Sequence, residues 1–263
     1  MRRALFFIAF FWWLAPCAFA TCAGVYLEDS APRFVSSTTP AQAQELCSDA
    51  FGVEYSPLTR TPLWAGEHLS AQSVESARAL PRRDRFEADS RLARNQRAEL
   101  GDYVHSGFDR GHLAPSGDMP TLAAQAQSFR LSNVAPQAAS LNRGAWEEIE
   151  AATRDLAVRN GEVFVITGVV FARAARAFIN NRVRVPDQIF KAVYDPQSGE
   201  AGVYIAANAP RSRLRVISLS QLQRLIGVDM FPALQAQAKA EASDVLHLTR
   251  ARYASSAGAI GQY

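Results

Sequence analysis

The sequence predicts a single α+β domain over residues 21–253, and three observations support this prediction. The chain has 263 residues, which is long enough to bury one substantial core. Apolar, β-branched segments typical of strands alternate with amphipathic segments of helical spacing. No internal repeat or linker-like change of composition divides the chain.

The first twenty residues have the layout of a cleaved secretory signal. Two arginines precede an unbroken apolar run, and small residues ending at Ala20 form the expected cleavage site. A retained membrane anchor is the alternative, but its strongest part, Ala4–Leu14, is shorter than the roughly 17 to 25 residues of a spanning helix, and Pro16 interrupts it. A lipid on Cys17 is a weaker alternative. We therefore expect a signal peptide over 1–20, export to the periplasm or the medium, and no stable membrane association after cleavage.

Removal of the signal leaves two cysteines, Cys22 and Cys47, in the mature chain. In an exported protein, two cysteines most simply form one disulfide, which here ties the new N-terminus to the segment around Cys47. A metal site built from them is not expected, because the histidines lie far away in the sequence.

The charge balance is close to neutral. The formal net charge is +3, and it falls to about +1 once Arg2 and Arg3 leave with the signal. Bulk charge therefore gives no argument for a polyanionic partner. All basic side chains except Lys191 and Lys239 are arginine, whose planar fork binds phosphate or carboxylate in two places. A genome of high GC content produces the same bias, so this observation carries little weight.

Strand and helix patterns follow one another after the cysteines. Residues 49–64 mix aromatic and β-branched residues with turn formers and predict strand and loop, while 68–80 predicts a helix capped by Ser70. The polar, arginine-rich stretch 81–107 predicts a loop or lid. The continuous apolar run 162–171 predicts a strand in the centre of a sheet.

The C-terminal part predicts a hairpin, a helix and a tail. Residues 185–208 have the pattern of two strands joined by a turn that contains proline and glycine. Residues 218–231 predict an amphipathic helix with Ser218 or Ser220 near its start. The small residues of 254–263 predict a flexible C-terminal tail.

The stretch GFDRGHLAPSGDM, Gly107 to Met119, places an arginine and a histidine between two glycines. A single histidine is more often structural than catalytic, but His112 lies two residues from Arg110 and precedes a proline-containing loop. Gly111 permits a close approach that a side chain would forbid. These neighbours make His112 a candidate for chemistry on a group that Arg110 holds.

A second group of candidates begins at Asn142. Asn142, Trp146 and Glu150 are spaced four residues apart, so a regular helix places them along one face. An amide oxygen and a carboxylate on one face can offer ligands to a hard cation such as Mg²⁺. The alternative is an ordinary helix in which Trp146 is buried in the core and Glu150 is solvated.

Taken together, DRGH, LSNVAPQ and LNRGAWEEIE resemble the DNA/RNA non-specific endonuclease family of the ββα-metal superfamily. The resemblance extends from about Phe51 to Phe231. It implies an α+β fold of the ββα-metal type, with a central, mostly antiparallel sheet flanked by helices. It also implies a metal-dependent endonuclease with one Mg²⁺ or Mn²⁺ ion in each active site.

The resemblance also assigns roles to individual residues. His112 matches the general base, Asn133 a residue that orients it, and Asn142 the ligand of the metal ion. Glu150 matches a carboxylate that supports the metal's water molecules. Arg110 matches a phosphate-binding arginine, as does one of the arginines before Phe86; Arg82 is favoured over Arg83 and Arg85.

The expected function is therefore an exported, Mg²⁺-dependent endonuclease that cuts DNA, RNA or both without sequence specificity. Its partner would be the phosphate backbone, since the assigned residues address phosphate and not base edges. The main alternative is a protein of the same fold that binds nucleic acid without cutting it. Arg143 is expected to point away from the ligand face of the helix.

Overall fold

The computed structural model describes residues 22–35, 42–171 and 177–248. The expected signal peptide 1–20 and the expected tail 254–263 lie outside the described residues. Among the helices of the described part, none combines the length and the apolarity that crossing a membrane requires.

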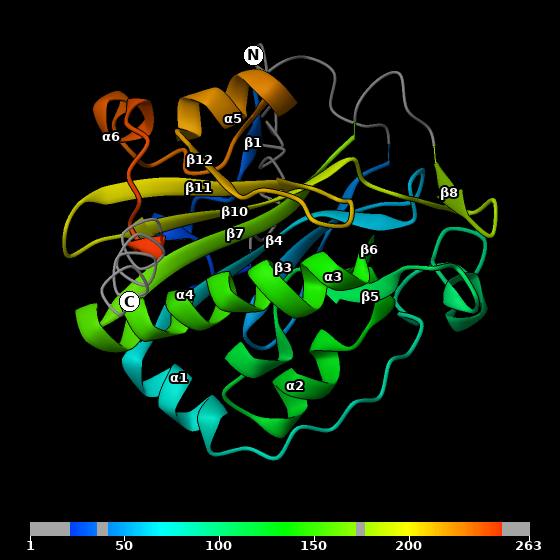
Figure 1. The fold of residues 1–263 in the computed structure, drawn as a ribbon. Helices are drawn as coiled ribbons and strands as arrows, with labels where there is room; N and C mark the ends of the chain where they lie inside the picture. Colours follow the sequence, from blue (N-terminus) through cyan, green and yellow to red (C-terminus); the bar gives the residue numbers. More distant parts are fainter. Residues whose placement is uncertain (1–21, 36–41, 172–176, 249–263) are drawn as a thin grey trace, which may run out of the picture.

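A seven-stranded sheet, antiparallel at every pairing, forms the centre of the molecule (Figure 1). Its strands are, in spatial order, β12 (Arg215–Ile217), β11 (Glu200–Ala207), β10 (Gln188–Asp195), β7 (Glu162–Val170), β4 (Thr61–Ser70), β3 (Phe51–Ser56) and β2 (Gln44–Cys47). The run expected to be a central strand is β7, which pairs with β4 and β10. The predicted α+β class with a central antiparallel sheet flanked by helices is confirmed.

The predicted hairpin is formed by β10 and β11. Asp195 holds the turn, because its carboxylate accepts hydrogen bonds from the backbone N–H of Gln197 and the hydroxyl of Ser198. Gly199 closes the turn at a φ of 73°, in the left-handed region that glycine adopts without strain.

Helices cover both faces of the sheet (Figure 1). The helices α1 (Ala71–Arg78), α2 (Leu122–Ser128) and α4 (Glu147–Asn160) lie on one side, and α5 (Leu219–Ile226) and α6 (Ala236–Ala240) lie on the other. Side chains of β10 alternate between the two faces, as the pleat of a strand requires. Ile189 packs in the core cluster of α4, whereas Phe190 packs in the cluster that contains Leu222 of α5.

The helix expected over 68–80 begins three residues later than predicted. Its first three residues, His68 to Ser70, complete β4 by pairing with β7. Ser70 is the expected cap: its hydroxyl accepts from the backbone N–H of Ser73, whose hydroxyl in turn accepts from the N–H of Ser70.

The helix expected over 218–231 ends at Ile226. Ser218 forms its N-cap in a reciprocal pair with Gln221. Gly227 then takes a φ of 72°, which ends the helix, and the next two residues form β13 (Val228–Asp229).

The remaining elements are short. In the described part of the chain, three two-stranded pairs stand apart from the main sheet: β1 (Arg33–Phe34) with β13, β5 (Asp109–His112) with β6 (Val134–Gln137), and β8 (Phe178–Ile179) with β9 (Val183–Arg184). Short helical turns are η1 (Leu27–Asp29), η2 (Leu100–Tyr103), η3 (Ser116–Asp118), η4 (Leu131–Asn133), α3 (Ala139–Leu141) and the π-helix η5 (Asn142–Trp146).

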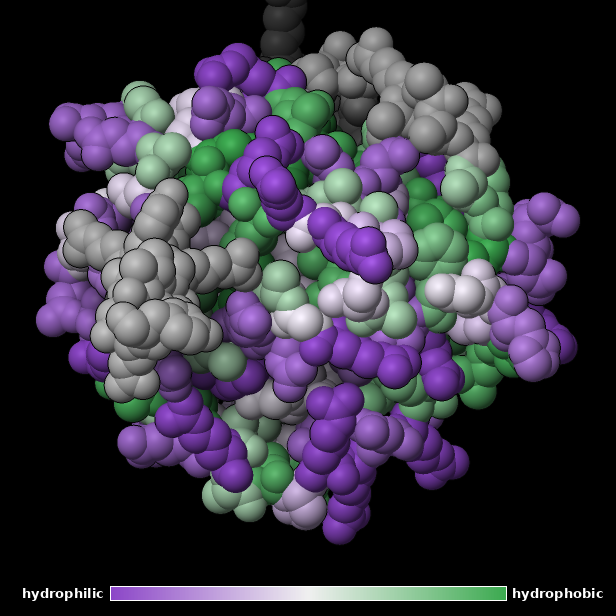
Figure 2. All heavy atoms as spheres, viewed as in Figure 1, coloured by the Kyte–Doolittle hydropathy of each residue, from purple (hydrophilic) through white to green (hydrophobic). Residues whose placement is uncertain are grey.

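The arginine-rich stretch after α1 is mostly irregular, as expected for a loop, but it is anchored (Figure 1). Asp89 is buried, where its carboxylate accepts hydrogen bonds from Arg91 and from the hydroxyl of Ser132. The chain then passes through η2, where Tyr103 is buried. Figure 2 shows mainly hydrophilic side chains over the lower half of the view, where α1, α2 and α4 lie.

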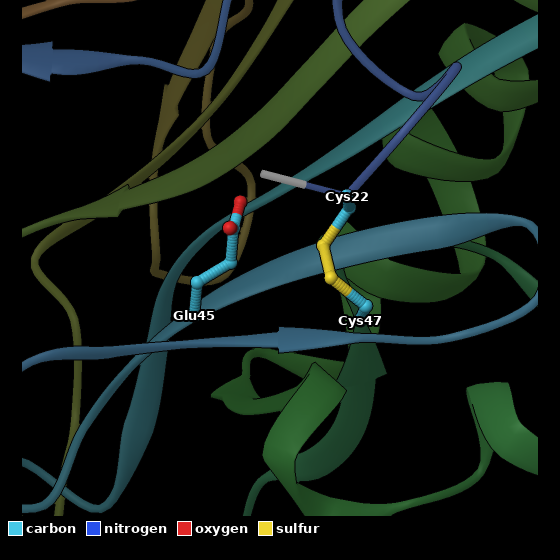
Figure 3. Close-up of side chains that lie close together, drawn as sticks. All are labelled: Cys22, Glu45 and Cys47. Carbon is cyan, nitrogen blue, oxygen red and sulfur yellow. A yellow bond between two sulfur atoms is a disulfide. The ribbon is translucent and has the colours of Figure 1, made fainter. Parts of the chain in front are cut away.

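Cys22 and Cys47 form the expected disulfide (Figure 3). It joins the start of the described chain to the end of β2, where Glu45 of the same strand lies beside the two sulfur atoms. Because both sulfurs are in the disulfide bond, neither offers the thiolate that a metal ligand requires.

Candidate active site

Two short strands and a helix bring the candidate residues together. His112 ends β5, opposite Val134 of β6, and β6 is followed along the chain by α3, η5 and α4. Gly111 pairs with Ala135, and a Cβ atom at residue 111 would collide with the side chain of Gln137, two residues further along β6. The close approach of the two strands therefore explains the glycine before the histidine.

A cavity of about 610 Å³ opens where these elements meet. Its volume lies in the range of small-molecule sites. Its wall includes Arg82, Arg110, His112, Asn142 and Glu150, five of the residues predicted from the sequence. Asn133, the sixth, lies outside it.

The His112 ring is held between two aromatic rings. Its centroid lies 5.2 Å from that of Phe86 and 4.9 Å from that of Phe129, with an almost perpendicular angle to the latter. Nε2 is shielded from solvent and has no hydrogen-bond partner among the described residues. Nε2 is thus closed to a water molecule in the cavity, which leaves Nδ1 as the candidate proton acceptor.

The surroundings of His112 keep the imidazole neutral. Burial lowers its pKa from 6.5 to about 3, and the positive charges of Arg82 and Arg110 act in the same direction, against an opposing effect of Asp84. A neutral imidazole can accept a proton at physiological pH.

The same aromatic rings position two arginines. The Arg110 guanidinium lies over the Phe86 ring at 4.4 Å, and that of Arg82 lies 5.8 Å from the Phe129 centroid. Arg83 and Arg85 instead line a smaller hollow beside α2. Of the three arginines that precede Phe86, the structure thus brings Arg82 to the cavity.

Asn133 acts on the backbone next to the histidine and not on its ring. Its amide accepts from the N–H of Ala114 at 3.0 Å and donates to the carbonyls of Ala114 and Ser128. The side chain is fully buried. Asn133 therefore fixes the backbone on both sides of the His112–Val134 strand pair and makes no hydrogen bond to the His112 ring.

Asp109 fixes Asn142 at the edge of the cavity. The Asn142 amide Nδ2 donates to Asp109 Oδ2 at 3.0 Å, so its carbonyl oxygen Oδ1 is left for another partner. Arg143 also binds Asp109, with Nε and Nη2 each donating to one carboxylate oxygen. The expectation that Arg143 points away from the site is wrong, because this ion pair draws it to the cavity wall.

The helix that carries these residues is not regular. Residues Asn142–Trp146 form a π-helix in which Gly144 departs from helical geometry. Asn142 and Glu150 both line the cavity, as the spacing predicted, whereas Trp146 is not between them but is buried in the core beneath the helix, as the alternative expected.

Glu150 offers a carboxylate with no hydrogen bond or ion pair to another described residue. Burial raises its pKa to about 7, and the nearby positive charge of Lys191 opposes this rise. One turn further along α4, Arg154 lines the cavity and donates to Asp118 at 2.7 Å.

The residues present fit a hard divalent cation. Asn142 Oδ1 and the Glu150 carboxylate are oxygen donors on one cavity wall, and Mg²⁺ needs few protein ligands because it retains several waters. A metal ion at this place would also add positive charge beside the Glu150 carboxylate, which has no ion pair to another described residue.

Sequence reasoning did not predict several charged residues of the cavity wall, among them Asp109, Glu147 and Arg154. Asp109 stands next to Arg110 in DRGH, and its partner, 33 residues away, is not visible from spacing. Arg154 follows Glu150 by four residues, so helical periodicity could have placed it on the same face.

The chain is similar to known nucleases over most of its length. The sequence model of the DNA/RNA non-specific endonuclease family matches residues 30–237. Nuclease C1 of Cunninghamella echinulata var. echinulata is 29% identical over 206 residues, which cover 71% of this chain and 82% of that protein. Human mitochondrial endonuclease G is 30% identical over 218 residues, covering 76% and 73% of the two chains. Zebrafish (Danio rerio) mitochondrial nuclease EXOG is 31% identical over 206 residues, 70% of this chain, and this chain spans only 60% of its length.

The fold is also similar to a solved structure. A chain from the crystal structure of the EndoG/EndoGI complex superimposes with a TM-score of 0.68 at 25% sequence identity, covering 77% of this chain and 91% of that one.

Proposed function

The chain belongs to the DNA/RNA non-specific endonuclease family, and from this premise we propose that it is an exported, Mg²⁺-dependent endonuclease that hydrolyses phosphodiester bonds of DNA, RNA or both. One observation carries the proposal: His112, Arg110, Arg82, Asn142 and Glu150 line the same cavity. Residues from positions 82 to 150 of the chain thus face one place where a phosphate can lie.

His112 acts as the general base. Because Nε2 is buried, Nδ1 takes the proton of a water molecule that attacks the phosphorus atom, while the bond from phosphorus to the leaving oxygen breaks and that oxygen takes a proton from solvent. The rings of Phe86 and Phe129 keep the imidazole in one orientation. Such a base contributes about 10² to 10⁴-fold to the rate.

Arg110 and Arg82 hold the phosphate. Attack places more negative charge on the phosphate oxygens, and a fixed guanidinium stabilises this charge better than reorienting water does. Asn142 and Glu150 hold the metal ion, which supplies further charge stabilisation on the phosphate oxygens when bound. No residue in this set addresses base edges, so cleavage is independent of sequence.

Export rests on the signal-like residues 1–20. The Cys22–Cys47 disulfide supports the same proposal, because disulfides persist in oxidising compartments and are rare in the cytosol. Detection of the uncleaved precursor as the main cytoplasmic species would contradict export.

Plasmid degradation tests the catalytic proposal. Protein beginning at residue 21 is expected to degrade plasmid DNA and RNA with Mg²⁺, to stop in EDTA, and to lose most activity as His112→Ala. Binding of intact DNA without cleavage under a series of divalent ions would instead identify a protein that binds nucleic acid without cutting it.

A further inference from the structure

The segment 82–87, which follows α1 and passes beside α2, is a ridge between two hollows (Figure 1). Its side chains alternate between them. One set lines the cavity of the candidate active site: Arg82, Asp84 and Phe86. The other set lines a smaller hollow of about 220 Å³: Arg83, Arg85 and Glu87. This period of two is that of an extended chain, in which successive side chains point to opposite sides.

Both ends of the ridge are anchored to the rest of the protein. At its start, the backbone N–H of Arg83 donates to Oε1 of Gln125, a buried side chain of α2, at 2.9 Å. At its end, the N–H of Glu87 donates to the Phe129 carbonyl at 3.2 Å, and the Glu87 carbonyl accepts from the Leu131 N–H at 2.8 Å. The ridge is therefore ordered before a ligand binds, which lowers the entropic cost of binding.

The two sides of the ridge differ in how their charges are balanced. On the cavity side, Arg82 donates to a carboxylate at 2.6 Å. On the other side, the Glu87 carboxylate is already paired with Arg130, at 3.7 Å. The exposed side chains of Arg83 and Arg85 form no ion pair or hydrogen bond with another described residue. The smaller hollow thus carries two positive charges that no protein group balances.

The arrangement of the smaller hollow suits a phosphate. Alternate residues of an extended chain lie about 6.5 Å apart, so the like charges of Arg83 and Arg85 repel each other unless an anion lies between them. A guanidinium fork binds a phosphate in two places. Below the arginines, Leu122 of α2 is 40% exposed and lies one turn from Ala126, so an apolar surface continues the hollow.

We propose that Arg83 and Arg85 form a second phosphate subsite, which binds a non-scissile phosphate of the strand whose scissile phosphate lies in the cavity. Only the chain 82–87 separates the two hollows, so one nucleic-acid strand that crosses the ridge brings a phosphate to each side. The subsite makes the protein favour substrates with several phosphates over a substrate with one. The inference rests on the proposed function, since it takes the cavity as the place of cleavage.

A comparison of two substrates tests the subsite. A dinucleoside monophosphate has a single phosphate, which the cavity takes, whereas a single-stranded DNA oligonucleotide can also fill the subsite. Arg83→Gln with Arg85→Gln removes the charge-assisted hydrogen bonds and should lower the ratio of kcat/KM for the oligonucleotide to kcat/KM for the dinucleotide about 10-fold. The slope of log kcat/KM for the oligonucleotide against log salt concentration should become shallower by about 1. An unchanged ratio overturns the subsite.

A charge-matched variant separates a local subsite from the net charge of the surface. Arg215→Gln with Arg224→Gln also removes two exposed arginines, from β12 and α5, which lie on the other side of the molecule from the ridge (Figure 1). This variant should keep the substrate ratio and the salt dependence of the wild type. Equal losses in the two double variants overturn the subsite, because net charge alone would then explain them.

Binding without metal distinguishes this inference from the proposed function. In EDTA, fluorescence anisotropy with a labelled oligonucleotide should show a Kd about 10-fold higher for Arg83→Gln with Arg85→Gln than for the wild type. A wild type that binds the oligonucleotide but never cuts it overturns the proposed endonuclease, while this difference in Kd still decides the subsite. A wild type that cuts, together with a variant of unchanged Kd, overturns the subsite alone.

Discussion

Two helices on opposite faces of the sheet, α4 and α5, meet it in different ways. Beneath α5 the contacts are apolar: Leu219 and Leu222 pack on Phe190 and Ala192. Beneath α4 the apolar cluster is interrupted by Glu67 and Lys191. The α5 helix is regular and capped at both ends, whereas α4 is preceded by a π-helix. This comparison indicates that one face of the sheet supports the fold while the other also supports the site.

The largest effect is expected at His112 on the site face. His112→Ala should reduce the cleavage rate about 10² to 10⁴-fold, since it removes the proton acceptor. His68→Ala is the matched control: His68 is a part-exposed histidine that binds Glu162 at 2.6 Å and takes no part in the cavity. Initial rates on plasmid DNA measure both, and equal losses in the two variants would remove His112 from the chemistry.

A mutation on the α5 face should lower the stability of the protein and leave its cleavage rate unchanged. Leu222→Ala deletes a fully buried side chain and should destabilise the protein by about 2–5 kcal/mol. At temperatures where the variant remains folded, its rate should stay near that of the wild type. Urea unfolding and initial rates measure the two quantities, and a stable but inactive variant would break the division between the faces.

Asp109 tests how the site holds its metal ligand. Asp109→Ala releases the amide of Asn142 and should weaken Mn²⁺ binding about 10-fold or more. Arg143→Ala should have a smaller effect, because Arg143 is 73% exposed and its loss leaves the Asp109–Asn142 bond in place. Calorimetric titration measures the Mn²⁺ affinity of both variants. A larger loss of affinity in Arg143→Ala would show that the Arg143–Asp109 ion pair, and not the Asp109–Asn142 hydrogen bond, holds the metal ligand in place.

The pH dependence of cleavage should differ between the free enzyme and the enzyme–substrate complex. Burial and the charges of Arg82 and Arg110 lower the pKa of His112 to about 3 in the free protein. A bound phosphate pairs with these arginines and raises this pKa again. At saturating metal, the acid limb of kcat should therefore lie at higher pH than that of kcat/KM, because kcat reports the complex and kcat/KM the free enzyme. Coincident limbs would contradict this coupling.

Much of the fold could be predicted from local patterns. The run at 162–171 predicted a central strand, Ser70 was correctly proposed as a helix cap, and of the two candidates Ser218 and Ser220 the structure has Ser218 as the cap. Boundaries were less predictable where two elements compete for the same residues. His68 and Leu69 pair with β7 instead of joining α1, a choice that depends on a strand almost 100 residues away.

The site, like the fold, could be predicted where local motifs carry the information and not where long-range contacts decide. Short motifs identified His112 and Asn142 as candidates, and the structure brings both to one cavity. The π-helix was not foreseen, because regular 3.6-residue spacing placed Trp146 at the site and gave no sign of the extra residue in that turn. The contacts of Asp109, and the burial of Glu67 and Lys191 beneath α4, depend on long-range packing that spacing does not contain.

The most direct test is the position of the divalent ion beside a bound phosphate. Crystals of the His112→Ala protein, soaked with Mn²⁺ and a short oligonucleotide, would locate the ion by anomalous scattering. The account predicts an ion about 2.1 Å from Asn142 Oδ1, with a phosphate between it and residue 112 and within hydrogen-bond reach of Arg110. The account would be contradicted by an ion that does not contact Asn142. It would also be contradicted by a phosphate that does not lie between the ion and residue 112.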